Sequence, residues 1–208
     1  IIIVGNLTIG GTGKTPLVAY IAQELSKLGY KPGLVSRGYG GKFRETLQVT
    51  DETPVKKTGD EAQILAKLNL PFYIDKNRVR AVKTLVDNHD CDVIISDDGL
   101  QHYSMGRDIE IVLIDGKRRF GNNLTFPAGP LRESTTRLKD VDFILAAGVR
   151  EAVTLVADAG GRDDHPVLEV EVQGVGGRAV RRHEGHVEAS GVRTVEQGRA
   201  LLVVYLKG

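Results

Sequence analysis

The sequence of 208 residues has one cysteine, no excess of charge of either sign and no long apolar run. The single Cys91 excludes an internal disulfide framework and a zinc site built from several cysteines, and it is typical of a reducing compartment. Lysine and arginine total 28 against 27 acidic residues, so the charge does not favour nucleic-acid binding and we expect none. No run approaches the roughly 18 apolar residues that span a bilayer, and no signal peptide is recognisable.

Apolar residues make up 41% of the chain, which is enough for a packed core. Apolar runs alternate with helical patterns, and this predicts an α/β fold with a mostly parallel sheet and helices on both faces. The predicted strands cover residues 1–5, 33–36, 92–96, 109–114 and 143–147. The predicted helices run from the first glycine-rich loop to Leu28, then over 59–69 and 76–88, the last with Val79, Val82 and Val86 on one face.

The stretch TIGGTGKT, residues 8–15, resembles the phosphate-binding pattern G-x-x-x-x-G-K-[ST], with Thr8 in place of the first glycine. A strand, a glycine-rich turn and a helix direct several backbone N–H groups at one point, where they bind an anion. We expect a phosphate group to be surrounded by the loop residues Thr8, Ile9, Gly10, Gly11, Thr12 and Gly13, where Gly10, Gly11 and Gly13 allow a close backbone approach. Lys14 would contact the terminal phosphates and the Thr15 hydroxyl would bind Mg²⁺. The alternative is a glycine-rich turn without a ligand.

The loop and the strand–helix alternation together predict a P-loop NTPase-like domain over residues 1–149. The chain opens on IIIVG without an initiator methionine, which we interpret as the middle of a strand with sequence missing upstream. Beyond residue 149 there is one lysine, Lys207, and no strong helix pattern, although VLEVEV at 167–172 and ALLVVYL at 200–206 predict strands. Residues 150–208 are therefore expected to be a poorly defined tail or an incomplete second domain.

A second candidate segment is IISDDGLQHY, in which an apolar strand is followed by two carboxylates, Asp97 and Asp98. In open α/β sheets, ligands bind at the carboxyl ends of the strands. A strand-end aspartate beside a phosphate loop normally holds Mg²⁺, although alone the same residues would form a solvated turn. Gln101 and His102 follow and are candidates to contact nucleotide or acceptor, whereas a lone histidine is as often structural.

TGDEAQ, residues 58–63, places Asp60 and Glu61 at a predicted helix start. The spacing alone favours a helix-capping role for these carboxylates, because the helix dipole attracts negative charge at that end. The functional alternative for Asp60 is a general base that accepts the proton of an acceptor hydroxyl.

Three arginines are candidates to bind phosphate. Arg37 lies in SRGYGGK, a glycine-rich segment after the second strand, and can bind phosphate bidentately or occupy a surface turn. Arg78 opens a predicted helix and can also face an anion. Arg132, in the proline-punctuated loop PAGPLRE, is a weaker candidate of the same kind.

The ordered set of motifs over residues 1 to about 148 resembles the tetraacyldisaccharide 4'-kinase family of lipid A synthesis. The resemblance rests on VGNLTIGGTGKTP, VSRGYGG, GDEAQILAKL, SDDGLQHY, RDIEIVLID and PAGPLRE. It implies transfer of the ATP γ-phosphoryl group to the 4'-hydroxyl of a tetraacylated disaccharide 1-phosphate, a lipid A precursor. It also implies an enzyme associated with the cytoplasmic face of the inner membrane of Gram-negative bacteria.

The resemblance also implies roles for individual residues. It places ATP at the loop from Thr8 to Thr15 and Mg²⁺ at Asp97 and Asp98. It makes Asp60 the base, so that Asp60, Lys14 and Asp98 are the expected catalytic residues, and it places Arg78, Gln101 and His102 near the phosphates or the acceptor. The resemblance thus reverses the preference for a capping role at Asp60.

Two features of the family are not found in this sequence. One is an N-terminal helical segment that anchors the family to the membrane, and the other is a histidine in a Pro-Asp-His motif, to which DDHP at 163–166 is only superficially similar. Two other interpretations remain open: a nucleotide-binding fragment without activity, and a switch ATPase with a deviant Walker loop. In the latter class, an early lysine acts across a dimer, and Ile9 occupies its position here.

Overall fold

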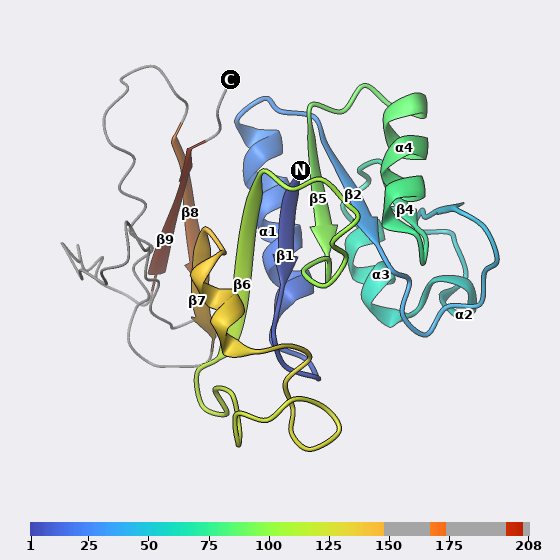
Figure 1. Ribbon diagram of the computed structural model, residues 1–208. Helices are drawn as coiled ribbons and strands as arrows, with labels where there is room; N and C mark the ends of the chain where they lie inside the picture. Colours follow the sequence, from blue (N-terminus) through green and yellow to red (C-terminus); the bar gives the residue numbers. More distant parts are fainter. Residues whose placement is uncertain (148–166, 174–198, 206–208) are drawn as a thin grey trace. The chain divides into compact units, whose positions relative to one another are not determined.

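The computed structural model describes residues 1–147 and the strand backbones over 167–173 and 199–205 (Figure 1). The chain divides into two units. The first unit consists of Ile1–Gly5 and Lys14–Ile109, and the second consists of Asn6–Gly13 and Glu110–Gly208. The domain boundary predicted between residues 149 and 150 lies outside the described residues.

The first unit is built on strands in the order β3-β4-β2-β5-β1. The neighbours β4–β2, β2–β5 and β5–β1 are parallel, and only β3 runs antiparallel to β4. The three strands predicted for this part of the chain are confirmed, whereas β3 and β4 are too short to give a readable alternation of polar and apolar residues. The strands span β1 Ile2–Gly5, β2 Pro32–Ser36, β3 Leu47–Gln48, β4 Phe72–Ile74 and β5 Val93–Asp97.

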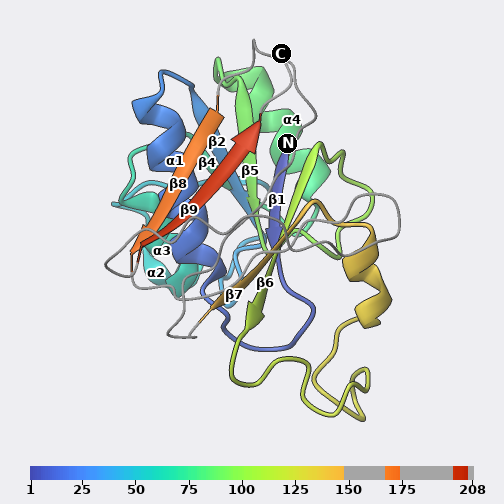
Figure 2. The same ribbon diagram turned by 90° about the vertical axis from the view of Figure 1, so that its left-hand side faces the viewer.

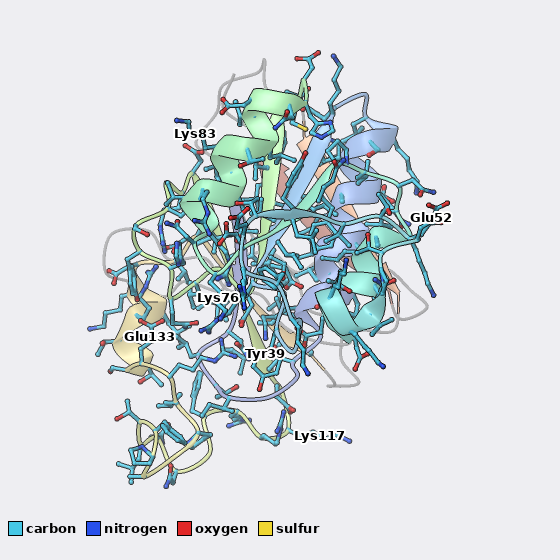
Figure 3. The ribbon with its side chains drawn as sticks, turned by 90° about the vertical axis from the view of Figure 1, so that its right-hand side faces the viewer. Tyr39, Glu52, Lys76, Lys83, Lys117 and Glu133 are labelled. Carbon is cyan, nitrogen blue, oxygen red and sulfur yellow. The ribbon has the colours of Figure 1, made fainter. Side chains whose placement is uncertain are left out.

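Helices cover both faces of these strands, as predicted. Figures 2 and 3 show α1 and α3 on one face and α4 on the opposite face. Among the described residues, none of the helices has the length and apolar character needed to cross a membrane. The helices span α1 Lys14–Lys27, α2 Val55–Thr58, α3 Asp60–Ala66 and α4 Arg78–Asn88.

The apolar face predicted for α4 is not the face that the helix buries. Val79 and Val86 are exposed, and the buried residues are Arg78, Ala81 and Leu85. The two sets have the same three- and four-residue spacing, so helical periodicity alone cannot choose between them. The second set is buried because Leu85 packs where β2 has a glycine.

That glycine is Gly33, and it allows a close approach of α4 to the sheet. A Cβ at this position would lie 2.5 Å from Leu85 Cδ2 and 2.9 Å from Cys91 Sγ. β1, β2 and β4 are buried throughout, and so is β5 after its first residue, as expected for parallel strands covered by helices, whereas the short antiparallel β3 is partly exposed. The largest buried side chains in this unit include Ile3, Ile21, Leu25, Leu34, Phe72, Leu85 and Ile95.

The second unit contains two separately paired sets of strands. β6 (Ile109–Asp115) runs parallel to β7 (Phe143–Ala147), which confirms both predicted strands, and the 3₁₀ helix η1 (Thr135–Lys139) precedes β7. In this unit the guanidinium of Arg137 lies 2.5 Å from the Glu110 carboxylate, and both side chains are largely buried. This ion pair joins η1 to the start of β6.

The two strands predicted in the C-terminal part are also confirmed. β8 (Val167–Gln173) pairs antiparallel with β9 (Arg199–Tyr205). The DDHP stretch at 163–166 lies outside the described residues.

Candidate active site

Two charged or polar pairs join the start of α1 to the end of β5 in the first unit. The Thr15 hydroxyl donates a 2.8 Å hydrogen bond to Asp97 Oδ2, and Lys14 Nζ lies 3.4 Å from Asp98 Oδ1. The parallel register of β1 and β5 sets Val4 opposite Asp97, so the carboxylates emerge at the strand edge from which the phosphate loop departs. The structure thus brings together four of the predicted site residues.

Asp97 is the buried member of the acidic pair, with 1% of its surface exposed. The pKa of this carboxyl is raised to about 6, chiefly by burial and in addition by the charges of Asp98 and Glu61, while the hydrogen bond from Thr15 and the charge of Lys14 oppose the shift. Its Oδ1 has no hydrogen-bond partner among the described residues. A buried carboxylate oxygen without a partner is suited to a cation, because a cation would relieve both the repulsion and the lost solvation.

The oxygens of Thr15, Asp97 and Asp98 fit Mg²⁺. Among the described residues there is no group of three or more histidine, cysteine or acidic side chains arranged to hold a metal. Mg²⁺ in nucleotide sites does not need one, because it is bound by one or two carboxylates together with phosphates and water. The fit therefore depends on a nucleotide being present, and the metal role of these residues stays a prediction.

Arg78 is buried beside the acidic pair, with 4% of its surface exposed. One guanidinium nitrogen donates a 3.0 Å hydrogen bond to the Asp98 carbonyl, and Nε has no partner in the described structure. Burial lowers the pKa of this arginine, as does the charge of Arg37, while Asp98, Asp97 and Asp75 oppose the shift. A buried guanidinium with an unused donor is suited to an anion, which agrees with the predicted phosphate role.

His102 faces several positive charges. Burial lowers the pKa of the imidazole, and the charges of Arg78, Arg107 and Arg37 lower it further. The ring is therefore neutral near pH 7, and Nε2 lies 3.2 Å from the Ser104 hydroxyl. The charges of Arg78 and of the exposed Arg37 thus act on His102, and the charge of Arg37 also acts on Arg78. The half-buried Gln101 precedes His102, and its contact with nucleotide or acceptor stays a prediction.

Asp60 begins α3 with an exposed carboxylate, and no described residue forms a hydrogen bond to it. The helix is preceded by Gly59, whose φ is 84°, a conformation that favours glycine. A Cβ on Gly59 would collide with the Tyr39 carbonyl, and a Cβ on Gly41 would collide with the Lys57 carbonyl. The glycines of the predicted SRGYGGK segment therefore let its backbone lie directly against the segment that leads to Asp60.

The described contacts do not join Asp60 to Lys14, Asp97 or Asp98. The charge of its neighbour Glu61 acts on Asp97, which relates the start of α3 to the acidic pair. Asp60 is therefore a carboxylate without a partner among the described residues, next to a residue whose charge acts on Asp97, and its role as base stays a prediction.

The phosphate loop up to Gly13 belongs to the second unit, and the side chain of Asn6 fixes its shape through hydrogen bonds to two loop carbonyls. The buried Asn6 amide donates to the carbonyls of Thr8 (2.8 Å) and Gly10 (3.3 Å). Gly10 and Gly13 have φ values of 105° and 86°, so both positions require glycine-like freedom. Thr12 is buried, and its hydroxyl has no partner among the described residues. Sequence reasoning did not identify Asn6, because its role depends on where the loop carbonyls turn.

The same loop is held from outside by the segment after β6. Thr8 forms a bridge with Leu131, and the Ile9 N–H donates to the Pro130 carbonyl at 2.8 Å. The backbone N–H of Arg132 donates to the Leu7 carbonyl at 2.7 Å. The predicted PAGPLRE loop therefore supports the phosphate loop through its backbone, while a phosphate contact of the Arg132 side chain stays a prediction.

Arg118 is a further residue on the loop that sequence reasoning missed. Its guanidinium donates to the Gly11 carbonyl at 3.1 Å and to Asp115 Oδ2 at 2.7 Å. A carbonyl that points at Arg118 cannot point at a bound phosphate, so this contact favours the inward direction of the neighbouring N–H groups. A signal was present in the sequence, where an aspartate at the end of a strand is followed three residues later by an arginine.

Comparison with known families agrees with this geometry. The family model for tetraacyldisaccharide-1-P 4'-kinase matches residues 1–203. The chain belongs to this family. The match extends beyond the motifs at 1–148 into the C-terminal part of the chain.

Curated relatives carry the same description. The tetraacyldisaccharide 4'-kinase of Pseudoalteromonas atlantica is 52% identical over 150 residues, which cover 71% of this chain and 49% of the relative. That of Coxiella burnetii is 48% identical over 181 residues, which cover 85% of this chain and 55% of the relative. The chain thus spans about half the length of the curated relatives it matches.

A solved structure shares the fold. The crystal structure of LpxK from Aquifex aeolicus in complex with ATP matches with a TM-score of 0.62 and 26% sequence identity. The match covers 74% of this chain and 62% of that chain. The predicted α/β fold of the nucleotide-binding part is confirmed by this likeness.

Proposed function

We propose that the protein is an ATP-dependent kinase that phosphorylates the 4'-hydroxyl of a tetraacyldisaccharide 1-phosphate. The observation that carries the proposal is the pairing of Lys14 with Asp98 and of Thr15 with Asp97, directly after a phosphate loop, in a chain of this family. Phosphoryl transfer needs mainly positioning and charge stabilisation, which these groups supply.

Each positive group has a distinct place in this proposal. Lys14 balances charge on the β- and γ-phosphates, and Arg78 directs its unused Nε donor to the transferred phosphoryl group or the acceptor phosphate. The loop N–H groups from Thr8 to Gly13 bind the phosphate oxygens. Nucleotide or acceptor is also contacted by Arg37, Gln101 and His102. His102 is neutral and adds no positive charge there.

The acidic residues divide between metal and proton. Thr15, Asp97 and Asp98 would hold Mg²⁺, which supplies charge neutralisation on the phosphate oxygens when bound. Asp60, which has no described protein partner, accepts the proton of the 4'-hydroxyl. A positioned carboxylate of this kind accelerates proton transfer by about 10²–10⁴-fold.

The acceptor is a lipid, and this bears on location. We propose that the enzyme works at the cytoplasmic face of the bacterial inner membrane, where the acyl chains of its acceptor are held. The support is the family to which the chain belongs. A switch ATPase with a deviant Walker loop is less well supported, because Ile9 occupies the position of the lysine that such proteins use.

The test is a transfer assay with γ-labelled ATP, Mg²⁺ and a tetraacyldisaccharide 1-phosphate dispersed in neutral detergent. We expect label in the lipid product and its loss in Lys14→Ala, because the ammonium lies at the phosphate end of α1. Lys27→Ala is the matched control, since Lys27 is an exposed lysine at the other end of the same helix. Release of free phosphate without labelled lipid would contradict the kinase and favour the ATPase.

A further inference from the structure

The chain between β6 and η1 runs over residues 116–134, and its part at 116–132, which ends just before Glu133, is basic and partly apolar. This part contains Lys117, Arg118, Arg119 and Arg132 and no acidic residue, although the whole chain has a formal net charge of only +1. We refer to it as the 116–132 loop. Figure 3 shows the side chain of Lys117 extending outward from it.

Two large apolar side chains of this loop are directed to solvent. Leu124 is 51% exposed and Phe126 is 68% exposed, and Phe126 is the most exposed of the five phenylalanines. The bridge from Leu131 to Thr125, which lies between these two residues, continues through the bridge from Leu131 to Thr8. Ile9, which is 47% exposed, follows Thr8. The exposed Ile9, Leu124 and Phe126 therefore lie on two backbone segments that both pair with Leu131.

Several backbone groups on either side of the exposed Leu124 and Phe126 are paired within the loop. Leu131 N–H donates to the Leu124 carbonyl at 3.1 Å, and Phe126 N–H donates to the Leu131 carbonyl at 2.7 Å. The Asn122 side chain accepts from Leu124 N–H and donates to the Ala128 carbonyl. These bonds lower the number of unpaired backbone groups that would accompany Leu124 and Phe126 into a poorly hydrated region, where unpaired groups are costly.

We propose that the 116–132 loop docks on the headgroup region of an anionic phospholipid bilayer, with Leu124 and Phe126 inserted and Lys117 and Arg119 at the lipid phosphates. Interfacial binding increases with buried apolar area and with attraction to anionic lipid, and the loop supplies both. The proposal rests on the proposed function, because a lipid acceptor has to be taken from a bilayer. Docking beside the phosphate loop would bring the acceptor to the nucleotide.

The experiment is co-sedimentation of the chain with vesicles of phosphatidylglycerol and phosphatidylcholine, and with vesicles of phosphatidylcholine alone. The apolar double variant Leu124→Ser/Phe126→Ser is expected to bind anionic vesicles at least about tenfold more weakly than wild type. Its matched control is Leu28→Ser/Val86→Ser, which removes two apolar residues of similar exposure from the first unit and should bind like wild type.

The basic contribution is tested by Lys117→Gln/Arg119→Gln. Each basic residue at an anionic surface contributes a factor of about five, so this variant is expected to lose about 30-fold on anionic vesicles. The loss should disappear at high salt, where surface charges are screened. Lys67→Gln/Lys83→Gln is the control, because both lysines are exposed and lie outside the loop.

Failure of docking and failure of the kinase are separable. The transfer assay on detergent-dispersed acceptor should be unaffected by both loop variants, so its absence in wild type would refute the kinase without touching the vesicle result. Equal vesicle binding by wild type, loop variants and controls would overturn the docking proposal. So would loop variants that bind vesicles normally but lose transfer to dispersed acceptor, because the loop would then contact the acceptor itself.

Discussion

Asp97→Asn is expected to stabilise the protein without ligands while impairing its use of Mg²⁺–ATP. Asp97 is almost fully buried, lies next to Asp98 and has an oxygen with no hydrogen-bond partner among the described residues. Asparagine removes the buried charge but keeps an oxygen that can accept the 2.8 Å hydrogen bond from Thr15. The buried, unpaired charge therefore lowers the stability of the ligand-free fold, and the proposed Mg²⁺ would relieve this cost.

The size of the effect follows from the pKa of Asp97, which burial raises from 3.8 to about 6. Because the folded state holds this proton more tightly than the unfolded chain, the free energy of unfolding falls as pH rises from about 4 to about 6. A shift of about two units corresponds to about 3 kcal/mol at neutral pH. For a chain of this size, Asp97→Asn should therefore raise Tm by about 6–12 °C at pH 7.5 and have little such effect at pH 4.

The assay is thermal or urea unfolding in EDTA at several pH values between 4 and 8, for wild type, Asp97→Asn and Asp87→Asn. Asp87 is an exposed residue of α4 and controls for the loss of one surface carboxylate. Mg²⁺–ATP should then raise the Tm of wild type more than that of Asp97→Asn. A stability difference between wild type and Asp97→Asn that does not change with pH would refute the reasoning, because it would mean that the buried carboxyl titrates normally.

Three further outcomes are expected. Asp60→Asn should lower kcat by about 10²–10⁴-fold and leave ATP affinity unchanged. Turnover and calorimetry measure this, with the exposed Asp51→Asn as control. A loss of ATP affinity instead would assign Asp60 to the nucleotide site. Arg118→Ala should weaken ATP binding by roughly tenfold, the size of one charge-assisted hydrogen bond, whereas the control Arg119→Ala should not. Equal ATP affinities of wild type and both variants in calorimetry would count against the contact of Arg118 with the loop. Gly41→Ala should lower kcat without changing ATP affinity, because its Cβ displaces the backbone that leads to Asp60; unchanged turnover would show that this backbone contact does not position the base.

Much of the nucleotide-binding part could be read from the sequence, because the information is local. A strand, a glycine turn and Lys14–Thr15 at a helix start need only short-range geometry to make an anion site. Asp97 closely follows the apolar run Val93–Ile95, which is typical of a strand buried on both faces, and parallel strands end at the same edge. These two facts were enough to predict that Asp97 and Thr15 would lie near each other.

Other properties depended on which surfaces meet in the folded chain. The apolar sets on α4 have the same spacing, and packing of Leu85 against Gly33 decided which was buried. Asn6 and Arg118 act on loop carbonyls whose directions depend on the turn as a whole. The raised pKa of Asp97 comes from loss of solvent around it, and no pattern of neighbours along the sequence determines solvation, because burial is produced by segments distant in the chain.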